Sequence, residues 1–143
     1  IGRKLLSVYG ANYVSKELWN TIKHNPKSSL ASWIIYGQSM SHPEHIKKSS
    51  FPDAPIKHTI NFPEGILSAI SAGMGIAQLP CIIADKVPDI MRLPEESAVY
   101  YSDLWVLTHK DLRHTLKVKT IMDHMAKSLL KHKDLFEGRV PYS

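Results

Sequence analysis

The sequence predicts an α/β fold, and the prediction rests mainly on the stretch Ile56–Pro80. Residues 56–61 read Ile-Lys-His-Thr-Ile-Asn, and this alternation of apolar and polar side chains is typical of a half-buried strand. A helix is predicted from Pro63, and Ile76–Leu79 has the apolar character of a second strand. A strand–helix–strand unit crosses over in the right-handed sense, so we expect the strands to belong to a parallel sheet.

The helix of this unit has recognisable ends. Pro63 suits the first helical position because it lacks an N–H group and has a fixed φ, and Glu64 places a carboxylate where the helix dipole favours negative charge. One face of the helix is apolar, with Ile66, Leu67, Ile70 and Met74. Gly73 and Gly75 permit the left-handed backbone conformation that ends a helix. The start of this helix follows the carboxyl end of a strand, where ligands of open α/β sheets bind.

The segment before this unit predicts two strands and a helix. Leu5–Tyr9 is expected to form a strand that leads into a turn at Gly10-Ala11-Asn12. Ser15 is a candidate N-cap for a helix of about two turns that ends near Asn25-Pro26. Leu30–Tyr36 is a continuous apolar run, which indicates a strand buried on both faces.

The remaining elements follow from local patterns. Gly37–Pro55 is the loosest part of the chain, with a short helix expected from Pro43 and capped by Ser41 or His42. Further along, we expect a helical turn at Cys81–Lys86, strands at Ile90–Leu93 and Leu104–Thr108, and a long amphipathic helix from Thr115 to Leu135 that is ended by Gly138 and Pro141.

Composition limits the class of protein. The chain has 143 residues, a net charge of +5 and 43% hydrophobic residues, which is enough for one globular domain. It contains neither an apolar run that could span a bilayer nor a visible signal peptide, so a soluble, cytoplasmic protein is expected. The lone Cys81 is expected to be a buried thiol.

Several chemistries lack their signatures. No G-x-S-x-G elbow or phosphate-binding loop is present, and Gly73-Met74-Gly75 follows a helix rather than a strand, so we expect no catalysis and no cofactor. The eight histidines include His42 and His45, but three or four ligands with fixed spacing are missing, and no metal site is expected. Without a helix-turn-helix or zinc finger, the chain by itself is expected to be a poor DNA binder.

The sequence resembles a known family. Residues 61–80, Asn-Phe-Pro-Glu-Gly-Ile-Leu-Ser-Ala-Ile-Ser-Ala-Gly-Met-Gly-Ile-Ala-Gln-Leu-Pro, are similar to the central segment of the effector-binding domain of LysR-type transcriptional regulators. Tyr13-Val14-Ser15 with its short helix, and Leu104–His109 with Asp111-Leu112-Arg113 and a long last helix, follow in the family's order. The resemblance therefore covers most of the chain.

The resemblance implies a periplasmic-binding-protein-like (type 2) α/β fold, in which two lobes are joined by crossing strands. Residues 13–102 are then a nearly complete second lobe, and residues 1–12 and 103–143 are the crossover strands and the C-terminal part of a truncated first lobe. Because the chain begins with Ile1 and not Met, we expect it to be cut from a longer protein that carries an N-terminal winged helix-turn-helix. Apolar surface on the last strand and helix is then expected to lack its usual cover, which favours a homo-oligomer.

The candidate effector-binding residues lie at the start of the central helix, on the crossover strands and at the end of the buried strand. Asn61, Phe62, Pro63 and Glu64 stand at the start of the central helix, although Asn61 could merely cap the turn and Phe62 could merely pack against the helix. The resemblance adds Gly10, Asn12, Tyr13 and Thr108 on the crossover strands, and Tyr36, which could place its hydroxyl at the cleft mouth with its ring buried or serve only in packing.

The function implied by the resemblance is effector sensing without catalysis. A small anionic metabolite would bind between the lobes and favour one lobe orientation, and this change would pass to the DNA-binding module of the full-length protein. The alternative is a periplasmic solute-binding module of a transporter, which shares the two-lobed architecture.

Overall fold

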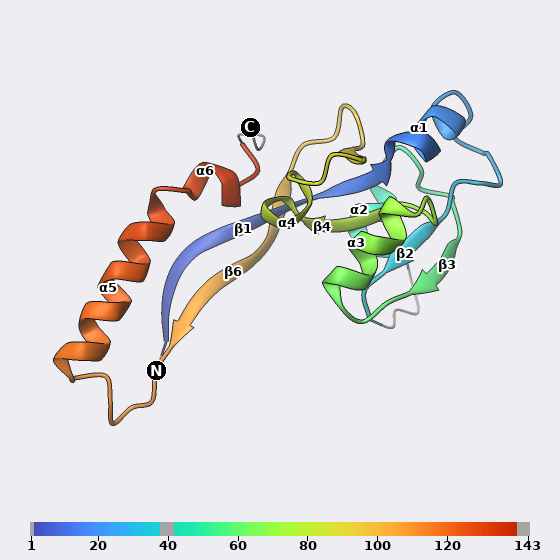
Figure 1. The fold of residues 1–143 in the computed structure, drawn as a ribbon. Coiled ribbons are helices and arrows are strands. Elements are labelled where there is room, and N and C mark those ends of the chain that lie inside the picture. The colour runs from blue at the N-terminus through green and yellow to red at the C-terminus, as the bar shows by residue number, and fades with distance from the viewer. Residues whose placement is uncertain (1, 38–41, 140–143) are drawn as a thin grey trace.

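A compact α/β unit and an extended arm make up the molecule (Figure 1). The computed structural model describes residues 2–37 and 42–139. In chain order the elements are β1 (Gly2–Ser15), α1 (Lys16–Ile22), β2 (Trp33–Ile35), α2 (Glu44–Lys47), β3 (Ile56–Thr59), α3 (Pro63–Ser71), β4 (Ala77–Pro80), α4 (Cys81–Ala84), β5 (Ile90–Arg92), β6 (Val99–Leu107), α5 (Leu116–Leu130) and α6 (Lys133–Phe136). None of the described helices is long and apolar enough to cross a membrane.

The strands of the compact unit form a mixed sheet. β3 pairs with β2 in parallel, and a parallel bridge from Trp33 to Ile76 continues the sheet towards β4. The Ile34 N–H donates to the Ile76 carbonyl at 2.8 Å, and the Ile76 N–H donates to the Ser32 carbonyl at 2.8 Å. β4 and β5 then pair antiparallel with β1. The predicted parallel strands are confirmed, but they are not direct neighbours because β2 lies between β3 and β4.

Helices cover both faces of this sheet. On one face, α3 and α4 pack on a cluster that includes Tyr13, Ile34 and Leu79. On the other face, α1 and α2 pack on a second cluster that includes Val14, Trp33 and Ile76. Because neighbouring strand residues point to opposite faces, β1, β2 and β5 contribute to both clusters. The three-layer arrangement explains why all three residues of β2 are buried.

Strand β1 is much longer than the sequence predicted. The expected turn at residues 10–12 is wrong, because β1 continues straight through it to Ser15. Gly10 pairs there with Pro80 of β4 on one side and Val99 of β6 on the other. A Cβ added at Gly10 would lie 3.0 Å from Tyr101 Cδ2 and 3.1 Å from the Leu79 carbonyl oxygen. The glycine therefore permits a close approach of strands and does not make a turn.

The short elements were predicted well. Ser15 caps α1, and its hydroxyl accepts a hydrogen bond from the Leu18 N–H at 3.1 Å. β3 keeps the half-buried alternation, α4 and β5 lie where expected, and the Cys81 side chain is fully buried. Burial raises the pKa of the Cys81 thiol. At α2 the N-cap residue is Pro43 and no side chain caps the helix, so the predicted cap by His42 is wrong, whereas Ser41 lies outside the described residues.

Other boundaries differ for physical reasons. The strand predicted at Leu30–Tyr36 contracts to β2, and both of its predicted end residues are exposed. Gly73 ends α3 with φ of 77°, as predicted, but Gly75 does not have positive φ. A Cβ at Gly75 would lie 2.7 Å from the Ser32 carbonyl oxygen, so this glycine is needed for close backbone contact. Met74 lies beyond α3 and is exposed rather than on its apolar face.

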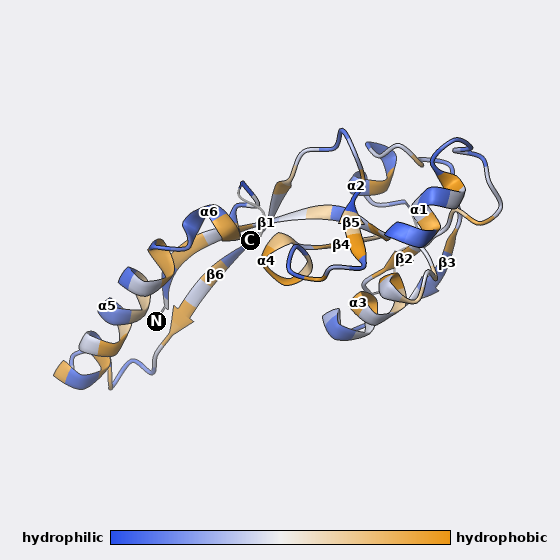
Figure 2. Ribbon diagram, turned by 45° about the horizontal axis from the view of Figure 1, so that its top comes forward, coloured by the Kyte–Doolittle hydropathy of each residue, from blue (hydrophilic) through white to orange (hydrophobic). Residues whose placement is uncertain are grey.

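The predicted last helix is divided in two. α5 ends at Leu130, and α6 begins at Lys133 after a short break. Gly138 follows α6 with φ of 67°, which agrees with its predicted role, whereas Pro141 lies outside the described residues. In Figure 2, hydrophobic and hydrophilic residues alternate around α5, as expected for an amphipathic helix.

The arm consists of the first half of β1, its partner β6, and α5 beside them (Figure 1). It leaves large apolar side chains exposed, and these are Trp105, Leu107, Leu116, Ile121 and Leu130. The expected uncovered apolar surface on the last strand and helix is therefore present. Such a surface is typical of a contact with another part of an assembly.

A polar cluster joins the compact unit to the C-terminal segment. The Arg92 guanidinium on β5 forms a bidentate pair with the carboxylate of Asp85, through Nε at 2.9 Å and through Nη2. Asp85 also accepts a hydrogen bond from the Tyr13 hydroxyl at 2.6 Å. Arg92 Nη1 donates to the Gly138 carbonyl at 2.9 Å. Burial, aided by the neighbouring Asp85, raises the pKa of Tyr13, which therefore remains a donor at neutral pH.

We predict that Arg92→Met lowers the free energy of unfolding by about 3 kcal/mol or more, because it leaves the Asp85 carboxylate buried without its counter-ion. The matched control is Arg3→Met, which removes an exposed ion pair with Asp123 and should change stability by less than about 1 kcal/mol. Urea unfolding of both variants measures the difference. Equal losses in the two variants would contradict the structural role assigned to Arg92.

Candidate functional site

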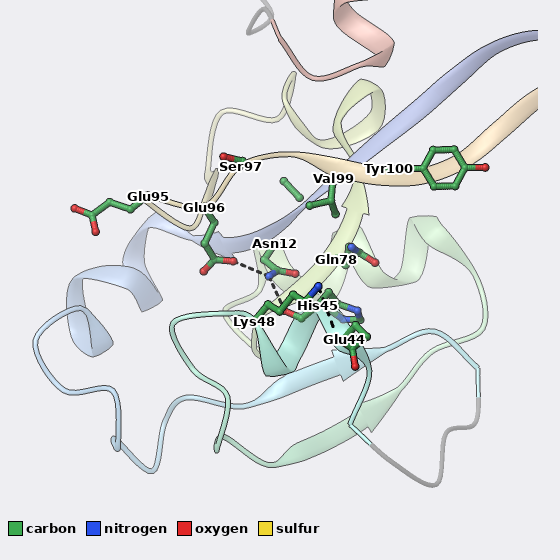
Figure 3. Close-up of a pocket in the computed structure, with 11 residues that line it drawn as sticks. Asn12, Glu44, His45, Lys48, Gln78, Glu95, Glu96, Ser97, Val99 and Tyr100 are labelled. Carbon is green, nitrogen blue, oxygen red and sulfur yellow. Dashed lines mark hydrogen bonds and ion pairs between the residues drawn. The ribbon is translucent and has the colours of Figure 1, made fainter.

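A pocket of about 490 Å³ opens where β1 and β6 leave the compact unit (Figure 3). Strands β1 and β4, helix α2 and the segment between β5 and β6 form its walls. Its lining residues are Ala11, Asn12, Glu44, His45, Lys48, Gln78, Glu95, Glu96, Ser97, Val99 and Tyr100. The pocket thus combines polar and charged groups with an apolar side.

Asn12 lies at the floor of the pocket. Only 7% of its surface is exposed, and its side chain faces away from the Tyr13 core because the two residues are neighbours on β1. Its amide nitrogen donates to Glu96 Oε1 at 2.8 Å and to the His45 carbonyl at 3.2 Å (Figure 3). Its amide oxygen, Oδ1, is buried and has no hydrogen-bond partner among the described residues. A buried acceptor without a donor costs about 1–3 kcal/mol.

Glu96 is held in place by the opposite wall. Its Oε2 accepts hydrogen bonds from the Ser50 N–H at 3.2 Å and the Ser50 hydroxyl at 3.1 Å. Together with the bond from Asn12, these contacts fix a carboxylate at the pocket. The preceding Glu95 has φ of 66°, and among the described residues it is the non-glycine residue with positive φ. Strained backbone of this kind is enriched at functional sites.

Helix α2 supplies the third wall. Glu44 forms ion pairs with Lys47 at 3.7 Å and Lys48 at 3.9 Å, all on the exposed surface. The His45 ring packs edge-on against Trp33, with 5.7 Å between ring centroids. Burial lowers the pKa of His45, because the charged imidazolium loses solvation. His45 is therefore neutral at neutral pH.

The crossover strands supply the apolar side. Val99 and Tyr100 begin β6, and both are about half exposed. Gln78 lies opposite Asn12 in the β1–β4 ladder, and its side chain makes no hydrogen bond with the described residues. A ligand here would contact β1, α2 and β6 at once. It would therefore touch the compact unit through α2 and the arm through β6.

Of the nine predicted site residues, the structure places only Asn12 in this pocket. Gly10 is buried between β4 and β6. Tyr13 points into the core of the other face and bonds to Asp85. Tyr36 is 62% exposed, so the proposed burial of its ring is wrong. Thr108 follows the end of β6, at the far end of the arm from the pocket.

The start of α3 forms a separate exposed surface. Asn61, Phe62, Pro63 and Glu64 are all exposed, and Pro63 is the first helical residue as predicted. The N-cap residue is Phe62 and not Asn61, and the cap has no side-chain hydrogen bond. The Phe62 ring lies over Gly65, where an added Cβ would come within 2.5 Å of Phe62 Cζ. Effector binding by these four residues stays a prediction.

Sequence reasoning missed the acidic and amide residues of the pocket. Glu95 and Glu96 follow Pro94 in a loop, and Gln78 lies within an apolar strand, so none stands out by pattern. His45 was considered only as a metal ligand. The described residues contain no group of three or more histidine, cysteine or acidic side chains that could hold a metal ion.

Comparisons with known proteins identify the fold. Neither a family model nor a curated protein sequence matches the chain. Among solved structures, the AmpR effector-binding domain from Citrobacter freundii superimposes with a TM-score of 0.63 at 17% identity, covering 92% of this chain and 68% of that one. The effector domain of the transcriptional regulator AmpR of Pseudomonas aeruginosa superimposes with a TM-score of 0.61 at 15% identity, and it also covers 92% of this chain and 68% of its own.

A full-length regulator also has this fold in its effector-binding part. LysG from Corynebacterium glutamicum, solved with arginine as bound effector, matches with a TM-score of 0.56 at 14% identity over 92% of this chain and 47% of its own. The chain therefore has the α/β, periplasmic-binding-protein-like fold of LysR-family effector-binding domains. It spans 68% of the AmpR domain, so one lobe of the fold is partial.

We predict that stability falls as the pH is lowered from about 7 to about 5, in part through His45. The unfolded chain binds a proton at this histidine near its ordinary pKa of about 6.5, whereas the folded pKa is lower, so protonation favours unfolding. His45→Phe keeps an aromatic ring against Trp33 and should make the pH dependence shallower. Urea unfolding at a series of pH values measures this.

The control for this prediction is His24→Gln, which changes an exposed histidine outside the pocket. This variant should keep the wild-type pH profile. If the free energy of unfolding of His45→Phe depends on pH as steeply as that of the wild type between about pH 5 and about pH 7, the role given to His45 is wrong.

Proposed function

We propose that the chain is the effector-sensing domain of a LysR-type DNA-binding transcriptional regulator. The observation that carries the proposal is the match of 92% of the chain to the AmpR effector-binding domain. A pocket at the junction of the compact unit and the arm adds a place for a small molecule. The function is binding, with no chemical conversion of the ligand.

The position of the pocket provides a mechanism. A ligand in it touches Asn12 on β1, Lys48 beside α2 and Tyr100 on β6. If the arm changes its angle to the compact unit, these contacts change together. A ligand shifts such an equilibrium only by its differential affinity for the two states. Residues that bridge the junction are therefore suited to sensing.

The lobe assignment belongs to this proposal. Residues 13–102 form the second lobe, and residues 1–12 and 103–143 form the crossover strands and part of the first lobe. In the intact regulator, a winged helix-turn-helix at the N-terminal side would bind DNA in the cytoplasm. The alternative of a transporter's solute-binding module shares the architecture, but the matched structures named above are regulator domains.

We predict that at least one compound in a broad metabolite library raises the melting temperature of the chain. A ligand at one hundred times its Kd stabilises the folded state by about 2.7 kcal/mol. Differential scanning fluorimetry detects this shift, and titration gives the affinity. The absence of any stabilising compound would contradict effector sensing by this chain.

Two substitutions locate the site of such a compound. Gln78→Ala removes a pocket side chain that makes no hydrogen bond with the described residues and should reduce the ligand-induced shift. Asn61→Ala changes an exposed residue at the start of α3, and its own stability should stay within about 0.5 kcal/mol of wild type. If Asn61→Ala leaves the ligand-induced shift in melting temperature unchanged, Asn61 does not belong to the binding site. If Gln78→Ala leaves it unchanged, the compound does not bind in this pocket.

We also propose that the chain forms a homo-oligomer through the exposed apolar residues of β6 and α5. Leu107 is 76% exposed and Leu116 is 79% exposed, so pairing would remove large apolar surfaces from water. Leu107→Lys should shift the mass measured by light scattering towards the monomer. Leu30→Lys, at an exposed leucine remote from the arm, is the control and should not. A monomeric wild type at all concentrations would contradict the proposal.

A further inference from the structure

We infer that the pocket at Asn12 takes an organic cation, an ammonium or guanidinium group attached to an apolar chain. The inference rests on the proposed effector-sensing function and names the chemical class of the effector. It differs from the small anionic metabolite that the family resemblance implies. Three features of the pocket carry it: the unpartnered oxygen of Asn12, the charge of the lining and its apolar side.

Asn12 requires a hydrogen-bond donor from a ligand. Its two amide hydrogens are used by two acceptors, the Glu96 carboxylate and the His45 carbonyl, so the orientation of the amide is fixed. The oxygen that remains can only accept. A side chain that is 93% buried and ends in an unsatisfied acceptor gains most from a ligand with N–H groups, because a carboxylate ligand has no hydrogen to donate.

The charge of the lining favours the same class. Glu44, Glu95 and Glu96 contribute carboxylates, and Lys48 is the lining residue with a positive charge. Lys48 Nζ lies 3.9 Å from Glu44 Oε2, so the charges of these two residues offset each other. Glu96 is held by Asn12 and Ser50, whereas Glu95 is exposed and forms no ion pair with the described residues. A cation entering the pocket meets net negative charge, whereas an anion is repelled.

The remaining wall accepts an apolar chain. Val99 and Tyr100 present exposed apolar surface beside these acidic groups. In Figure 3 Val99 lies on the side of the pocket opposite α2, and the Tyr100 ring extends outward along β6. The Tyr100 ring packs edge-on against Tyr9, with 6.4 Å between ring centroids, so this apolar wall continues along the arm. The pocket therefore suits a molecule with a charged head and an apolar body.

The residue paired with Asn12 also lines the pocket. The Oδ1 atom has less than 1 Å² of exposed surface, so it lies just below the pocket floor. Gln78 is the paired residue on β4 and lines the same pocket (Figure 3). Its side chain makes no hydrogen bond with the described residues, so it is available to a ligand in the pocket.

Two probes with the same alkyl chain and opposite charge test the inference: hexylammonium and heptanoate. Isothermal titration gives their affinities, and spectra of the ¹⁵N-labelled chain follow the side-chain amide signals of Asn12 and Gln78. We expect hexylammonium to bind and to shift both amide signals, and heptanoate to do neither. Glu95→Gln should weaken hexylammonium about threefold to fivefold, as expected for a partly exposed charge pair.

The matched control is Glu17→Gln, which makes the same charge change on exposed α1 outside the pocket and should leave the affinity unchanged. Equal weakening by both substitutions, or binding without amide shifts, would show non-specific attraction and overturn the inference. Binding of heptanoate at the amides would overturn the ligand class while leaving effector sensing intact. Binding of neither probe would also overturn it, and the library screen decides the sensing function separately.

Discussion

Strand β1 is the constraint on which the rest of the structure depends. Its backbone pairs with β6 from Gly2 to Gly10, with β4 from Gly10 to Tyr13 and with β5 from Tyr13 to Ser15. Buried backbone groups must keep their partners, so β1 curves along the arm without leaving its ladders, and the register with β6 is irregular between Lys4 and Leu6 and between Val8 and Tyr9. The compact unit and the arm therefore share one strand. Gly10 lies where β1 exchanges one set of partners for the other.

Two neighbouring residues of β1 stabilise this junction on opposite faces. Tyr13 donates to Asp85, which Arg92 ties to the Gly138 carbonyl near the end of the described chain. Asn12 donates to Glu96 and to the backbone of α2. On the Tyr13 face, the Tyr13 hydroxyl and the Arg92 guanidinium donate hydrogen bonds that the Asp85 carboxylate and the Gly138 carbonyl accept. On the Asn12 face one acceptor has no donor, and this difference separates a structural cluster from a binding pocket.

The pocket is placed where binding and movement can be coupled. A compound that fills it contacts the compact unit through α2 and the arm through β6. Strand β1 and the Arg92 cluster both connect the two parts near this point. Small changes in their angle would alter the shape of the pocket more than the cores on either side, because packed cores deform little. The energy of ligand binding can thus be passed to the orientation of the arm.

The sequence by itself determined the local elements and the fold class. Alternation in residues 56–61, Pro63 at a helix start, Ser15 as an N-cap and Gly73 as a terminator each depend on neighbours within a few residues, and each is confirmed. The order of these elements was sufficient to indicate the family fold. Local signals failed at Gly10, where a glycine that usually marks a turn instead lets two strands approach from both sides.

Only the tertiary structure decided the site. Asn12, His45, Gln78 and Glu96 are separated by more than thirty residues in most pairs, and they meet because antiparallel pairing places β4 beside β1 and the loop before β6 folds over them. No local pattern records that the Asn12 oxygen is left without a donor. Sequence fixes what a residue can do within its own turn of helix or strand, whereas burial and charge at a pocket depend on segments that only long-range packing brings together.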